Sequence, residues 1–156
     1  MFVPYSQISL QASVWIYQSD RKLNSLEKKD ISYQLSSLCE NWNAHGKPLN
    51  CSFQLHDWFI CLFVDENEHQ ASGCSIDSSV SVIKSIANQY DIDFFNRMNI
   101  AYIDNNETNV LPLNDFKKII KSNMKIYNNL VKTKADFEEN RIGTVEDSWL
   151  KKYLKI

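Results

Sequence analysis

The feature that most constrains the fold of this chain is an uninterrupted apolar run, "WFICLFV", at residues 58–64. The run is much shorter than the roughly 18 residues that a membrane span requires. Its aromatic and β-branched side chains are those that strands favour. A continuous apolar run of this length is typical of a strand that is covered on both faces. It therefore predicts the central strand of a sheet that is buried on both sides.

Three further segments have the composition of strands, being rich in β-branched or aromatic residues and bounded by polar ones. They are residues 13–19, 50–56 and 98–104. In the second segment apolar and polar side chains alternate, which is typical of a half-exposed strand. A short fifth strand is expected at "VLPL", where Pro112 predicts an edge position.

Two longer segments carry apolar side chains at helical spacing. The first opens with Asn24 and Glu27, which have the spacing of a capping box, and it should end near Gly46 and Pro48. The second runs to about Tyr90. The apolar positions are Ile31, Leu35, Leu38 and Trp42 in the first segment, and Ile76, Val80, Ile83, Ala87 and Tyr90 in the second.

The order strand, helix, strand, strand, helix, strand is the split β-α-β pattern. We therefore expect an α+β fold with a ferredoxin-like antiparallel sheet as its core, over about residues 13–104. A mixed sheet in another strand order and a partly closed barrel remain open. Residues 105–156 should add a C-terminal extension of a short hairpin and two helices. The whole chain, 1–156, is expected to form a single α+β domain.

The C-terminal helices are expected at two places. A cap at Asn114 should open a helix that ends near Ser122, and a second helix should follow Thr144. That last helix carries Trp149 and Leu150, which we expect to dock on the body of the protein.

The charge of the chain is unevenly distributed along its 156 residues. Residues 1–110 carry 7 basic and 13 acidic side chains, whereas residues 111–156 carry 10 and 6. The C-terminal lysines form short groups and no concentrated stripe, so nucleic acid stays open as a partner but is not favoured.

The cysteines and the chain start bear on the cellular compartment. The four cysteines form no C-x-x-C pair, which predicts reduced thiols. No targeting segment opens the chain and no run is long enough for membrane insertion. We therefore expect a cytoplasmic protein.

The stretch "EHQASGCSIDSSV", residues 68–80, is the candidate functional segment. It places small hydroxyl residues at the start of the second helix, where exposed N–H groups favour an anion. In the expected topology His45 lies at the same end of the sheet. The predicted binding residues are His45, Ser72, Gly73, Ser75, Asp77, Ser78 and Ser79. We expect a non-catalytic binding or accessory module that takes a small anionic ligand or a protein partner.

A thiol-dependent hydrolase or acyl transferase is the alternative function. Cys74 would be the nucleophile, because a helix N-terminus favours the thiolate. His45 or His69 would act as the base and Asp77 would orient it. A third interpretation, in which these residues only cap the helix, also remains open.

Several other functions find no support in the residues. The chain lacks G-x-x-x-x-G-K-[ST], which argues against a P-loop ATPase. It also lacks H-x-x-x-H and C-x-x-C, so no metal site is expected. No cofactor is expected either.

Six segments of the chain together resemble a family of short bacterial proteins labelled "ABC transporter ATPase". They are "FVPYSQIS", "VWIYQSDRKL", "WNAHGKPL", "ASGCSIDSSV", "DFFNRMNIAY" and "NNLVKTKADFE". The resemblance covers nearly the whole chain, although the Walker A loop that an ATPase would need is missing. It implies no activity and no catalytic residue for this sequence.

Overall fold

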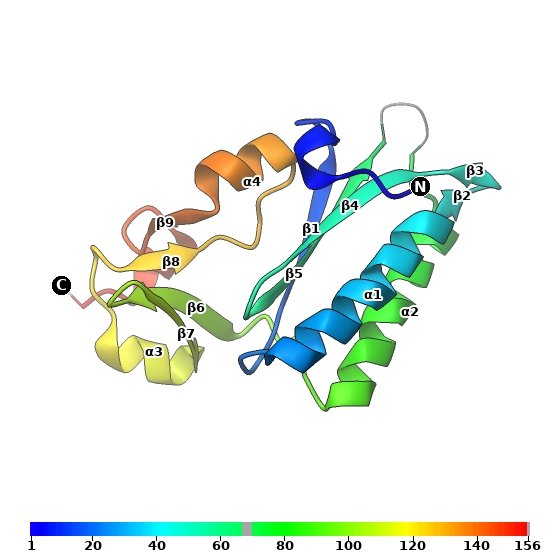
Figure 1. Cartoon of the computed structure of the whole chain (residues 1–156). Helices are drawn as coiled ribbons and strands as arrows, with labels where there is room; N and C mark the ends of the chain where they lie inside the picture. Colours follow the sequence, from blue (N-terminus) through cyan, green and yellow to red (C-terminus); the bar gives the residue numbers. More distant parts are fainter. Residues whose placement is uncertain (67–69, 156) are drawn as a thin grey trace.

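The computed structural model describes residues 1–66 and 70–155 and has a mixed α+β architecture (Figure 1). Four strands, β2 to β5, follow one another between the two long helices α1 and α2. The strands are β1 (Ser13–Gln18), β2 (Asn43–Ala44), β3 (Lys47–Pro48), β4 (Asn50–Leu55), β5 (Phe59–Asp65), β6 (Asn99–Asp104), β7 (Glu107–Pro112), β8 (Lys125–Tyr127) and β9 (Ile142–Thr144). The α-helices are α1 (Ser25–Asn41), α2 (Gly73–Tyr90), α3 (Leu113–Ile119) and α4 (Lys134–Asn140), and the 3₁₀ helices are η1 (Tyr5–Gln7) and η2 (Trp149–Tyr153).

The first sheet has the order β1-β5-β4, and both pairings are antiparallel. Helices α1 and α2 lie side by side on one face of this sheet (Figure 1). On that face Ile60 and Leu62 of β5 pack against Ile31 of α1 and Ile83 of α2. Side chains alternate across a strand, so the intervening residues of β5 point to the opposite face.

The opposite face of β5 is also covered, as the apolar run predicts. Phe59, Cys61 and Phe63 pack in a core that includes Ala101 of β6 and Phe137 of α4. This shared core joins the first sheet to the C-terminal half of the chain. The prediction of a central strand buried on both faces is therefore confirmed.

The second sheet has the order β7-β6-β8-β9 and is antiparallel throughout. Its core includes Ile100 and Ile126 on the strands, Phe116 on α3 and Leu150 on η2. Strands β6 and β7 form a hairpin through Asn105 and Asn106. The edge position predicted for Pro112 is confirmed, because β7 is the first strand of this sheet.

The expected ferredoxin-like core is not confirmed. That core requires the strand at 99–104 to lie beside β1, but β6 pairs with β7 and β8 in the second sheet. A two-residue turn makes β7 the partner with the smallest loop to close. The start of β1 is instead bridged by a later segment, since Val14 N–H donates to the carbonyl of Lys132 at 3.1 Å and Ser13 pairs with Thr133.

Both predicted long helices are present, and their ends differ from the prediction at one place. Asn24 and Glu27 form the expected capping box of α1. The helix ends earlier than expected, at Asn41, because Trp42 turns into the core with an extended backbone. Gly46 belongs to the turn of the β2–β3 hairpin and does not end the helix.

The C-terminal extension contains more strands and helices than the predicted hairpin and two helices. Helix α3 begins at Leu113, directly after Pro112, and not after a cap at Asn114. The last helix is the short 3₁₀ helix η2, which is capped by Ser148. Helix α4 and strands β8 and β9 were not predicted.

No helix among the described residues is long and apolar enough to cross a membrane.

Candidate functional site

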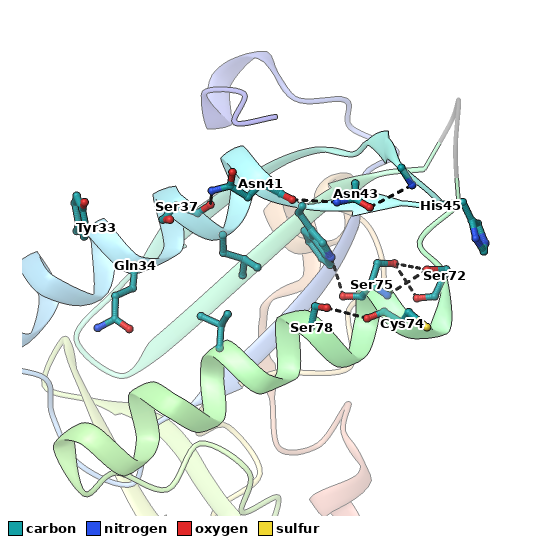
Figure 2. A pocket seen from close by; sticks show the side chains of 14 residues that line it. Tyr33, Gln34, Ser37, Asn41, Asn43, His45, Ser72, Cys74, Ser75 and Ser78 are labelled. Carbon is teal, nitrogen blue, oxygen red and sulfur yellow. Dashed lines mark hydrogen bonds between the residues drawn. The ribbon is translucent and has the colours of Figure 1, made fainter.

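A pocket of about 650 Å³ lies between α1, the β2–β3 hairpin and the start of α2. Figure 2 shows the side chains of α1 and α2 that face each other across it. The lining residues are Tyr33, Gln34, Ser37, Leu38, Asn41, Trp42, Asn43, His45, Gly46, Ser72, Cys74, Ser75, Ser78 and Val82. Two segments that lie apart in the sequence, 33–46 and 72–82, thus form a single site.

Trp42 fixes the two walls of the pocket relative to each other. Its indole N–H donates to the backbone carbonyl of Ser75 at 2.7 Å, and this bond is buried. The ring also packs edge-on against Trp15, with 5.5 Å between the ring centroids. A buried indole needs such a partner for its N–H, so the end of α1 is held against the first turn of α2.

The tip of the β2–β3 hairpin presents His45 at the end of the pocket (Figure 2). His45 has a φ of 54°, and the next residue, Gly46, has a φ of 77°. The side chain of Asn43 accepts the N–H of Gly46 at 3.3 Å, which closes the turn. A non-glycine residue with positive φ is uncommon, and here it exposes the imidazole.

Hydroxyl groups line the first turn of α2. Ser72 is the N-cap, and its Oγ accepts the N–H of Ser75 at 3.1 Å. The hydroxyl of Ser75 donates to the carbonyl of Ser72 at 2.8 Å, and that of Ser78 donates to the carbonyl of Cys74 at 3.0 Å. The hydroxyl hydrogens of Ser75 and Ser78 are used in these bonds, but each hydroxyl oxygen can still accept a hydrogen bond from a ligand.

The structure brings four of the seven predicted binding residues into this pocket, namely His45, Ser72, Ser75 and Ser78. Cys74, the nucleophile of the alternative function, also lines it. Gly73 opens α2 and is exposed, but it is not among the lining residues.

Two further predicted site residues, Asp77 and Ser79, are also not among the lining residues. Asp77 is exposed on α2. Ser79 is fully buried and donates its hydroxyl to the carbonyl of Ile76 at 2.7 Å, so it belongs to the helix interior. His69 lies outside the described residues.

Cys74 differs from the other three cysteines. All four are free thiols, but Cys39, Cys51 and Cys61 are buried whereas Cys74 is exposed. Burial raises the pKa of the Cys61 thiol to about 12, which makes that group unreactive. Within the described part of the chain, Cys74 has no hydrogen bond to His45 or Asp77, so these three side chains do not form a hydrogen-bonded nucleophile, base and orienter chain.

The lining of the pocket is polar but carries little charge. In the described part of the chain, His45 is the only lining residue among the His, Lys, Arg, Asp and Glu side chains. Leu38, Trp42 and Val82 add apolar surface between the polar groups. The described residues also contain no group of three or more His, Cys, Asp or Glu side chains that could hold a metal ion.

The prediction from sequence missed the α1 wall of the pocket. Tyr33, Ser37 and Asn41 lie four residues apart, which places them on one face of the helix. The same spacing relates Cys74, Ser78 and Val82 on α2. The polar side chains at this spacing on α1 could have indicated the wall of a pocket, although a row of polar side chains on a helix usually faces solvent.

Comparisons with known proteins give no relative. The chain matches no protein-family model, no curated protein and no solved structure. The resemblance described from the sequence segments therefore stays a prediction.

Proposed function

We propose that this protein is a non-catalytic binding module whose pocket between α1 and α2 takes a small ligand with an anionic group. The observation that carries the proposal is the pocket itself, since a cavity of about 650 Å³ is within the size range of small-molecule sites. Neutral hydrogen-bonding groups and three apolar side chains line it, which suits a ligand that is partly polar and partly apolar.

The start of α2 supports an anionic group on the ligand. The partial positive charge of a helix N-terminus attracts anions, and α2 is 18 residues long. Among the residues that the structure describes, no Asp or Glu side chain lines the pocket to repel such a group.

The direct test is a thermal-shift screen with phosphorylated metabolites, nucleotides and small carboxylates. A ligand at 100 times its Kd raises the free energy of unfolding by about 2.7 kcal/mol. For a chain of this size that corresponds to a rise in Tm of about 5–11 °C. We expect at least one compound to produce it.

A pair of matched variants locates the ligand. Ser78→Phe fills the pocket and should abolish the shift, whereas Ser81→Phe places the same side chain at an exposed position of α2 outside the lining. Ser81→Phe should keep the shift. A shift that persists in Ser78→Phe, or the absence of any ligand in the screen, contradicts the proposal.

A thiol-dependent hydrolase or acyl transferase is the second candidate, favoured by the exposed Cys74 in the same pocket as His45. An activated thiolate would react with iodoacetamide below pH 7.5 faster than a free cysteine does, and His45→Gln would slow it. Alkylation at the rate of free cysteine, unchanged by His45→Gln, removes this candidate.

A cytoplasmic location stays a prediction from the sequence.

A further inference from the structure

A cluster of lysine and aromatic side chains lies at the opposite half of the molecule from the pocket. It consists of Lys117 on α3 and of Trp149, Lys152 and Tyr153 on η2, and is called the basic-aromatic patch here. The Nζ atom of Lys117 lies 4.3 Å from the centroid of the Tyr153 ring, and that of Lys152 lies 5.1 Å from the same centroid. Two elements that are distant in sequence thus present one surface.

Among the described residues, neither lysine of the patch is held in an ion pair. The ammonium groups of Lys117 and Lys152 converge on one tyrosine ring. Like charges held this close repel each other, so the patch favours a bound anion. Exposed lysines on the same elements or directly after them extend the charge, namely Lys121, Lys151 and Lys155.

Trp149 is exposed although it stands next to a core residue. It is 47% exposed, whereas Leu150 is 1% exposed and fills the core of the second sheet. The Trp149 and Tyr153 rings meet edge to face with 6.1 Å between their centroids. The core therefore does not need the indole ring, which stays accessible to a partner.

We propose that the basic-aromatic patch binds single-stranded nucleic acid, with a base stacked on Trp149 and phosphates held by Lys117 and Lys152. Flat aromatic rings beside unpaired cations are the elements that single-strand binding proteins combine. A duplex partner does not fit, because reading a groove takes a helix or β-ribbon that inserts into it and η2 is only five residues long. A membrane surface does not fit either, because η2 buries Leu150 and leaves no continuous apolar face.

The test is fluorescence anisotropy of a fluorescein-labelled uridine dodecamer with the 156-residue chain. Each phosphate contact on a single strand contributes about 0.7 to the slope of log K against log salt, so two contacts give about 1.4. We expect Kd to rise about 25-fold when potassium chloride is raised tenfold. Lys117→Gln with Lys152→Gln should remove this part of the slope.

The aromatic contribution is tested separately by Trp149→Ala. Loss of one base–aromatic stack should raise Kd by about 5- to 140-fold, and Trp149→Phe should restore part of the affinity. Lys29→Gln with Lys84→Gln is the matched charge control, because both lysines are exposed on α1 and α2. This control should leave Kd and the salt slope nearly unchanged.

Three results would overturn the proposal. The first is that the chain does not bind the dodecamer at low salt. The second is that the Lys29→Gln and Lys84→Gln control weakens dodecamer binding as much as the patch variants do. The third is that the chain binds phosphatidylserine vesicles and not the dodecamer. Circular dichroism of each variant checks that it folds. The pocket variant Ser78→Phe should bind the dodecamer like the unmodified chain, so failure here and failure of the pocket proposal are distinguishable.

Discussion

Glu27 takes part in both a helix cap and an ion pair. Its Oε1 accepts the backbone N–H of Asn24 at 3.0 Å and an N–H of Arg21 at 2.9 Å, while Oε2 accepts a second N–H of Arg21. The side chain is largely buried. The guanidinium of Arg21 holds the pKa of Glu27 at about 2, below its ordinary value of 4.5.

This lowered pKa makes stability depend on pH. Because the folded-state pKa of Glu27 lies below the unfolded value, its contribution is complete above about pH 4.5 and is lost as the pH falls toward 2. Glu27→Gln keeps the cap but loses the ion pair, which should cost about 1–3 kcal/mol at pH 7. Urea denaturation at pH 7 and pH 3 should show a smaller difference between the two proteins at pH 3.

The exposed residue Glu107 provides the control for this prediction. Glu107→Gln should change the free energy of unfolding by less than about 0.5 kcal/mol at either pH, as surface substitutions usually do. A loss in Glu27→Gln that is the same at pH 7 and pH 3 would contradict the ion-pair explanation.

The sequence predicted the local part of this arrangement. The spacing of Asn24 and Glu27 identifies the capping box, because both partners are within one helical turn. The contact of Arg21 with the carbonyl of Tyr90 could not be predicted, since it joins the start of α1 to the end of α2.

At the scale of elements, the turn between β6 and β7 decides which strands pair. Asn105 and Asn106 both have positive φ, of 51° and 63°, as a two-residue type I′ turn requires. Asparagine tolerates this conformation better than most residues do. The tight turn favours a local hairpin over the pairing of β6 with β1.

Substitution of Asn106 tests this role. Asn106→Val should lower the free energy of unfolding by about 1–3 kcal/mol, because a β-branched side chain is strained at positive φ, while Asn106→Gly should not lower it. Asn109→Val is the control, since Asn109 lies in strand β7, where valine is favoured. Chemical denaturation measures all three. Equal losses at 106 and 109 would show that the turn geometry is not limiting.

For the whole molecule, the core around Phe137 holds the two sheets together. Phe137 of α4 packs edge to face on Phe63 of β5 at 5.1 Å, and the guanidinium of Arg141 lies 4.7 Å from its ring centroid. Ala101 of β6 belongs to the same core. We therefore expect the chain to behave as the single domain predicted from its length.

Phe137→Ala should lower the free energy of unfolding by about 3–5 kcal/mol, because it leaves a cavity between the sheets. Phe95→Ala is the matched control and should cost much less, since Phe95 is 41% exposed. Unfolding of the unmodified chain should be one transition by both circular dichroism and tryptophan fluorescence. Two separate transitions would contradict a single cooperative domain.

Some features of this protein follow from the sequence alone. The central buried strand, the two long helices and the capping box of α1 all depend on neighbouring residues, so periodicity and local spacing predict them. These signals fix which elements form, but they carry little information about which elements meet.

The tertiary structure alone decided the second partner of β6 and the second wall of the pocket. The turn at Asn105 and Asn106 sets the local pairing of β6 with β7, but the pairing of β6 with β8 depends on competition between edges that are far apart in sequence. The pocket depends on Trp42 reaching Ser75, a contact across 33 positions. Local sequence does not encode such a contact, because its free energy is gained only when distant segments pack.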